Sequence, residues 1–181
     1  SSDVCSSDLP GPGDQMHTGH GGDFVDAELI KQIQAKYNGA QITKDMARRW
    51  KEQFSFVSTS TPKNPVMVDF SIEGKAMTLD ITDCMQAACE SIVDPIVENV
   101  KTLIADSNPE FHDEFRANMV LAGGGSGIKG LGAMIERRLS DMGDVNVHVV
   151  DDPVRLGAMG GLRLSMEVPE EMWKNLTLAS R

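Results

Sequence analysis

The feature that most constrains this sequence is a glycine-rich segment, residues 121–131, which reads LAGGGSGIKGL. It follows an apolar run at 119–122 that predicts a β-strand, and it precedes an amphipathic pattern at 131–142 that predicts a helix. Glycines at such a junction let the backbone approach a ligand, while the helix N-terminus offers free N–H groups and a positive dipole to phosphate. The segment therefore predicts a nucleotide site, and the alternative is a tight turn without a ligand.

A dinucleotide-binding motif is a competing interpretation of the same segment. Gly125, Gly127 and Gly130 match the spacing G-x-G-x-x-G, and Asp151 ends the next predicted strand about 20 residues later. That fold needs several further strand–helix units, whereas only residues 153–181 follow this strand in the sequence. The spacing of a Walker loop, G-x-x-x-x-G-K-[S/T], does not occur here.

Charge and composition narrow the class of function. The sequence has 17 Lys and Arg against 27 Asp and Glu, and its formal net charge of −10 argues against binding to nucleic acid or to an anionic membrane. No apolar run approaches the roughly 18 residues of a membrane span, and no signal pattern begins the sequence. We therefore expect a cytoplasmic protein, in which Cys84 and Cys89 are buried thiols in a reducing compartment.

The two ends of the sequence are set apart from the folded part. Residues 1–9 read SSDVCSSDL, a near-repeat without apolar periodicity, which we interpret as a foreign or disordered tail. Residues 177–181 are expected to be a frayed tail.

Between these ends, apolar periodicity predicts a mixed α/β organisation. A helix from Asp23 to Tyr37 is expected to be capped by Asp23, with Asp26 as a solvated charge in its first turn. A long amphipathic pattern from Thr82 to Leu103 predicts one helix that is bent at Pro95. The other predicted elements are a helix capped by Thr43, a hairpin of strands 66–70 and 76–80, a strand at 145–150 and a helix at 154–166.

Several segments together carry a resemblance to a known family. The pattern MVLAGGGSGIKGL at 119–131 is similar to the adenosine motif of the actin-like ATPase superfamily. The segment KEQFSFV at 51–57 resembles the Lys-Glu helix of actins, and GGDFVD at 21–26 resembles the helix start after their second phosphate loop. With PGPGDQ at 10–15 and PEEMWKNL at 169–176, the sequence is most similar to the bacterial actin-like filament proteins of magnetosome chains, and the resemblance covers Pro10 to about Leu176.

The resemblance implies the C-terminal half of an actin-like ATPase, an α/β fold with a ribonuclease H-like sheet and helices. Residues 10–42 would form the first part of the large subdomain, and residues 82–176 its second part. Residues 43–81 would form a small inserted α+β subdomain. Half of a rod-shape-determining protein, half of a sugar kinase, or the dinucleotide-binding domain above remain the alternatives.

The resemblance also implies a site for ATP in the cleft between two halves. Gly123, Gly124, Gly125 and Ser126 would approach the adenosine and phosphate, with Ile128 beside the base. Lys51 and Glu52 would border the adenine and ribose, although without the resemblance they are simply a solvated helix pair.

No catalytic residue and no metal ligand is assigned in this sequence, because the family's phosphate loops and water-orienting carboxylate would lie upstream of Pro10. The Mg²⁺ that accompanies ATP would be held mainly by that missing half. The resemblance also implies that the full-length parent protein is an ATPase. Its main partner would be itself, in a cytoplasmic, cytoskeletal homopolymer filament, and magnetosome-associated proteins are a further candidate; neither nucleic acid nor a membrane span is expected.

Overall fold

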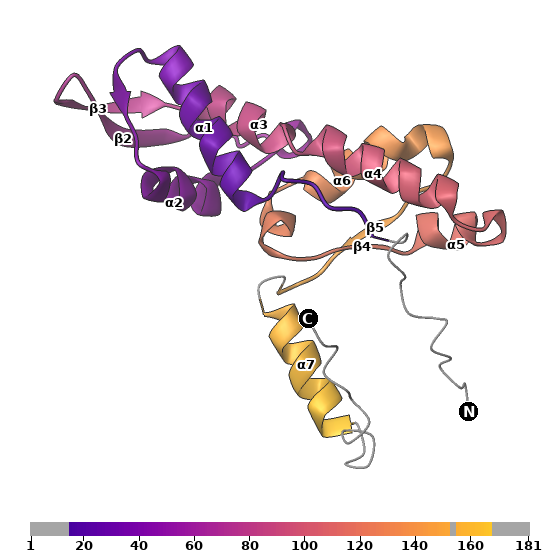
Figure 1. The fold of residues 1–181 in the computed structure, drawn as a ribbon. Helices are drawn as coiled ribbons and strands as arrows, with labels where there is room; N and C mark the ends of the chain where they lie inside the picture. The colour runs from indigo at the N-terminus through magenta and orange to yellow at the C-terminus, as the bar shows by residue number, and fades with distance from the viewer. Residues whose placement is uncertain (1–14, 153–154, 168–181) are drawn as a thin grey trace.

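A computed structural model describes residues 15–152 and 155–167 (Figure 1). Both predicted tails, 1–9 and 177–181, lie outside the described residues. In Figure 1, helices α1 to α3 lie with a three-stranded sheet at one end of the body, and helices α4 to α6 lie with a two-stranded sheet at the other. Buried apolar residues from both ends form one continuous core.

The three-stranded sheet consists of β1 (Ala40–Gln41), β2 (Met67–Ile72) and β3 (Lys75–Asp80), in that order and antiparallel. Glu73 and Gly74 connect β2 to β3 with positive φ angles of 48° and 81°, the backbone of a two-residue turn that matches strand twist. The predicted hairpin is therefore confirmed. The aromatic ring of Phe70 packs from β2 against Trp50 and Tyr37.

Helices α1 (Gly22–Lys36) and α2 (Lys44–Phe54) pack against each other, and Trp50 connects α2 to Phe70 of the sheet. The Oγ1 of Thr43 accepts a hydrogen bond from the Met46 N–H at 3.2 Å, so the predicted cap of α2 is confirmed. The predicted cap of α1 is wrong, because the helix already begins at Gly22 and Asp23 is in its first turn. Gly21 occupies the cap position and supplies no side-chain acceptor.

The single bent helix predicted from Thr82 is also wrong: the structure has two helices, α3 (Thr82–Glu90) and α4 (Val93–Asp106). The break lies at Ser91 and Ile92, before Pro95. Pro95 is in the first turn of α4, where a missing N–H removes no helical hydrogen bond, so the proline is accommodated without a kink. Helix α3 packs against α1, and α4 packs against α6.

The second sheet pairs β4 (Met119–Leu121) with β5 (Val147–Val149) in parallel. The connection between them runs through the glycine-rich segment and helix α6 (Leu131–Leu139), which packs against β5. A short helix, α5 (His112–Ala117), precedes β4, and α7 (Leu156–Glu167) follows β5. Among the described residues, no helix is both long and apolar enough to cross a bilayer.

Candidate functional site

The glycine-rich segment leaves β4 as a compact loop, residues 122–130, before α6 begins. Gly123 has a φ of 86°, which turns the chain out of the strand in a region that favours glycine. The loop then forms one turn of 3₁₀-helix, η5 (Gly124–Gly127), in which the Ser126 N–H donates to the Gly123 carbonyl at 3.0 Å. Gly130, with a φ of 83°, re-aims the chain into α6. The strand–loop–helix order predicted from the sequence is therefore confirmed.

Ser126 and Ile128 hold the loop together from within. The Ser126 hydroxyl donates to the Gly123 carbonyl at 2.8 Å, and the residue is 5% exposed. Ile128 is 6% exposed and belongs to the hydrophobic core. Both side chains therefore fix the backbone of the loop, and this structural role does not depend on a ligand.

Four of the loop glycines expose bare backbone. A Cβ built on Gly123, Gly124, Gly125 or Gly127 would meet no heavy atom within 4 Å, so open space lies against all four positions. The next helix, α6, has no side-chain cap. Its Leu131 N–H donates to the Ile128 carbonyl at 3.1 Å, so the amides of Gly132 and Ala133 are the ones left for other acceptors. Bare glycine backbone beside an uncapped helix start is the donor set that a nucleotide phosphate or ribose needs, and the loop therefore fits such a group.

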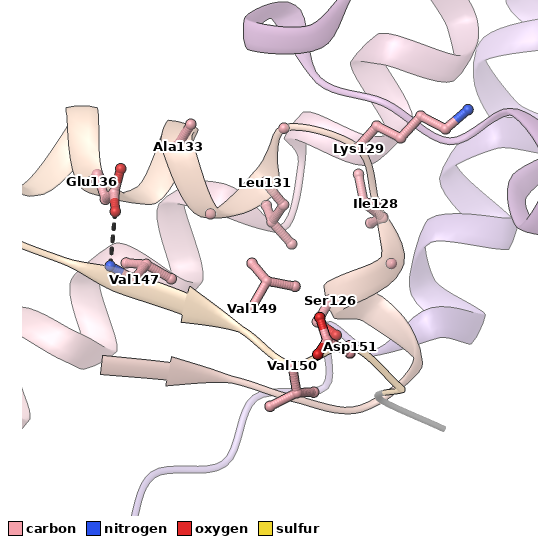
Figure 2. A pocket seen from close by; sticks show the side chains of 13 residues that line it. Ser126, Ile128, Lys129, Leu131, Ala133, Glu136, Val147, Val149, Val150 and Asp151 are labelled. Atoms are coloured by element: carbon pink, nitrogen blue, oxygen red, sulfur yellow. Dashed lines mark hydrogen bonds between the residues drawn. The ribbon is translucent and has the colours of Figure 1, made fainter. Parts of the chain in front are cut away.

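A cavity of about 410 Å³ adjoins the loop, between the start of α6 and the end of β5. Figure 2 shows Val149 directed into it from β5 and Leu131 from α6, with Ser126, Val150 and Asp151 at one end. The Lys129 side chain points away from the cavity. Its described walls combine apolar side chains with glycine backbone, Ser126 and the carboxyl groups of Glu136 and Asp151, and this lining suits a flat, mostly apolar group better than a phosphate.

Glu136 has a structural role at the wall of this cavity. Its Oε1 accepts a hydrogen bond from the Val147 N–H at 2.8 Å, a contact that Figure 2 shows as a dashed line between α6 and β5. The contact ties the helix after the glycine loop to the strand beside it.

The other two predicted site residues, Lys51 and Glu52, lie near the end of α2. The Lys51 ammonium donates to the Gly22 carbonyl at 2.7 Å and lies 2.7 Å from Oδ1 of Asp26, whose side chain is 3% exposed. Within the described structure Oδ1 has no well-aligned hydrogen-bond donor, so the contact is an ion pair. Glu52 is exposed. Arg48 approaches the same carboxylate at 3.7 Å.

Asp26 is a residue whose role the sequence analysis missed, because it was expected to be solvated. Its position on the inner face of α1, beside the buried Val25 and Leu29, turns it toward α2. The signal available in the sequence was its spacing from Leu29 and Ile33, which places all three on one helix face. A carboxylate on an apolar face requires a cationic partner, and α2 supplies Lys51.

The residues directly after α2 contact the exit of the glycine loop and so connect the two parts of the predicted site. Phe56, two residues after α2, forms an isolated parallel β-bridge with Lys129 at the exit of the glycine loop. The Val57 N–H donates to the Lys129 carbonyl at 3.0 Å. The structure therefore fastens the segment that follows Lys51 and Glu52 directly to the loop.

Comparison with known proteins decides the family. The family model described as MreB/Mbl protein matches residues 15–172, which is most of the sequence. The chain belongs to the MreB/Mbl family. The expected relation to bacterial actin-like proteins is thereby confirmed, and a dinucleotide-binding domain is no longer a competing interpretation of the glycine loop.

Relatives within this branch of proteins are named actin-like protein MamK. That of Paramagnetospirillum magneticum is 37% identical over 176 residues, which are 96% of this chain and 50% of the relative. That of Magnetospirillum gryphiswaldense is 34% identical over 176 residues, 96% of this chain and 48% of the relative. The chain thus spans about half the length of the relatives it matches.

Solved structures agree with this assignment. A MamK double helical filament superimposes with a TM-score of 0.83 at 38% identity, covering 90% of this chain and 49% of the other. A non-polymerising MamK mutant bound to AMPPNP gives a TM-score of 0.80 at 38% identity, covering 88% of this chain and 48% of the other. The actin-like fold expected from the sequence is confirmed.

Proposed function

We propose that this chain is the C-terminal half of a MamK-like filament protein, whose assembly is controlled by binding and hydrolysis of ATP. The observation that carries the proposal is the glycine loop: four glycines that face open space precede an uncapped helix, in a chain whose fold is that of MamK. A MamK structure holds AMPPNP, an ATP analogue, and another is a filament. For this chain, nucleotide binding and filament formation are parts of the proposal.

In this proposal the loop backbone binds the nucleotide. Gly123, Gly124 and Gly125 would let the chain approach the adenosine and phosphates. The amides of Gly124 and Gly125 at the start of η5, and those of Gly132 and Ala133 at the start of α6, would donate to them. Ser126 would hold the loop closed through its hydrogen bond to Gly123. Ile128 would lie beside the base, at the cavity next to the loop.

Lys51 and Glu52 would border the adenine and ribose from α2. Because Asp26 and the Gly22 carbonyl already engage the Lys51 ammonium, we expect Lys51 to contribute its aliphatic stem and its fixed position. The exposed Glu52 carboxylate is the member of the pair that is free to accept ribose hydroxyl hydrogens.

Hydrolysis would need groups from the remaining half of the protein. Phosphoryl transfer depends on a positioned water and on carboxylates that hold Mg²⁺, which neutralises phosphate charge. In the part of the chain that the structure describes, no three His, Cys, Asp or Glu side chains gather as metal ligands. We therefore assign both the metal ligands and the catalytic carboxylate to the other half.

The proposed partner is a second copy of the same protein, in a cytoplasmic homopolymer of the cytoskeleton. Organising magnetosomes, through magnetosome-associated proteins, is the finer part of the proposal and rests on similarity to MamK.

Sedimentation of the complete protein tests the proposal. With ATP and Mg²⁺ we expect the protein to pellet and to show filaments by electron microscopy, and without nucleotide we expect it to stay in the supernatant. A complete protein that neither binds ATP nor pellets would contradict the proposed function.

A further inference from the structure

The segment that connects α2 to the rest of the fold, residues 55–60, is called the strap here. Two backbone hydrogen bonds join it to the exit of the glycine loop. The Lys129 N–H donates to the Ser55 carbonyl at 3.3 Å, and the Val57 N–H donates to the Lys129 carbonyl at 3.0 Å. Phe56 and Val57 are almost fully buried, so these bonds are shielded from water on one side.

A third contact, between Thr59 and Gly130, packs the strap closely against the end of the loop. The Thr59 hydroxyl donates to the Gly130 carbonyl at 2.7 Å. A Cβ on Gly130 would lie 2.5 Å from the Thr59 Oγ1 and 2.8 Å from the Ser60 Cβ. The strap therefore covers the point at which the loop turns into α6, and only glycine fits beneath it.

The strap is also anchored by Glu90, at the end of α3. Its Oε1 accepts a hydrogen bond from the Ser58 N–H at 2.8 Å and another from the Gln86 side-chain amide at 3.2 Å. A carboxylate that accepts a backbone N–H makes a stronger bond than a neutral group does. Helix α3 thus holds the strap, and the strap holds the loop exit.

We propose that Glu90 is a positioning residue for the nucleotide site, acting through the strap on the backbone of the glycine loop. The loop is continuous with β4 at its entry and with α6 at its exit, and the strap adds three hydrogen bonds at the exit to the core packing of Ile128. Figure 2 shows the Lys129 side chain directed away from the cavity, so at this residue the backbone carries the contact. When the strap is released, the loop populates shapes that do not bind, and the apparent affinity falls by the fraction lost.

The inference rests on the proposed function, and it makes Lys51, Glu52 and the loop one rigid unit. The strap begins directly after α2 ends at Phe54, so its bonds to the loop also fix the position of that helix. Release of Glu90 should therefore loosen both parts of the nucleotide site at once.

The experiment compares Glu90→Ala with Glu90→Gln in the complete protein. A glutamine retains an oxygen that can accept the Ser58 N–H, whereas alanine removes the acceptor. The measured quantities are affinity for a fluorescent ATP analogue, melting temperature, and hydrogen exchange at the Val57 and Lys129 amides. Glu28→Ala is the matched control, since Glu28 also accepts side-chain hydrogen bonds but lies within α1.

We expect Glu90→Ala to weaken nucleotide affinity about fivefold, which corresponds to one lost hydrogen bond, and to speed exchange at both amides. Glu90→Gln should restore the affinity, and Glu28→Ala should leave it unchanged. Thr59→Val, which removes only a hydroxyl, gives a second reading if Glu90→Ala does not fold, and it should weaken affinity in the same direction.

The outcomes separate the two proposals. If the wild-type protein binds no nucleotide, the proposed function fails and the positioning role fails with it. If the wild type binds, but Glu90→Ala, or Thr59→Val in its place, binds equally well, the positioning role alone is overturned. The positioning role is also overturned if Glu90→Gln loses as much nucleotide affinity as Glu90→Ala.

Discussion

The Nζ of Lys51 lies 2.7 Å from Oδ1 of Asp26, and this ion pair joins α2 to α1. The two side chains are 15% and 3% exposed, so little water screens the pair. Because α2 also leads into the strap, the pair fixes one end of the unit that carries the candidate nucleotide site.

Replacing Asp26 with Ala should destabilise the fold strongly. The change leaves the Lys51 ammonium, on a side chain that is only 15% exposed, without its counter-charge, and breaking a buried pair from one side costs about 3 kcal/mol of unfolding free energy. Urea unfolding measures the loss. The double variant Asp26→Ala with Lys51→Met should lose less unfolding free energy than the two single variants lose together. If the losses simply add, the two residues are not coupled.

Gly130→Ala should be far more damaging than Gly127→Ala. At Gly130 the φ of 83° is unfavourable for alanine and the new Cβ would collide with the strap, whereas at Gly127 it would face open space. We expect Gly130→Ala to lose roughly 1–3 kcal/mol of stability and Gly127→Ala less than about 1 kcal/mol. Equal melting temperatures for the two variants would refute the contact between strap and loop.

Alkaline pH should destabilise the protein through Cys89. Burial raises the pKa of this thiol to about 11, so the folded state keeps its proton at a pH where the unfolded state has lost it. The unfolded state then binds fewer protons, and stability falls as pH rises from about 9 toward 11. Unfolding free energy against pH should show a shallower fall in Cys89→Ala, and an unchanged slope would exclude Cys89 as the cause.

The 181-residue chain alone should neither release phosphate from ATP nor form regular filaments. Phosphoryl transfer needs metal-linked carboxylates and an oriented water, which we assign to the other half of the protein. A phosphate-release assay on the purified chain, with the complete protein as positive control, checks this. ATP-dependent phosphate release by the chain alone would show that its own residues complete the catalytic site.

Local signals in the sequence predicted several parts of this fold correctly. Thr43 caps α2, Glu73 and Gly74 form the hairpin turn, and the glycine loop joins a strand to a helix. Each depends on a few neighbouring residues, whose hydrogen bonds and backbone angles are decided locally. The role of the loop as one side of a nucleotide site remains a prediction.

Long-range packing explains what the sequence did not reveal. Apolar residues continue on both sides of Ser91, so periodicity gave no sign of the break between α3 and α4. Asp26 is buried because α2 brings Lys51 to it from 25 residues away. The demand for glycine at position 130 arises from its φ of 83° and also from Thr59 and Ser60, which only the folded chain places against it.

Nucleotide affinity and melting temperature, measured together on Gly124→Val in the complete protein, test the central claim most directly. A Cβ at Gly124 meets no protein atom within 4 Å, so a valine side chain would project into the space assigned to the ligand. We predict that affinity for ATP falls at least about tenfold while the melting temperature stays close to that of Gly19→Val, a control glycine that also faces open space. Unchanged ATP affinity with a lowered melting temperature would contradict the assignment of this loop to the nucleotide.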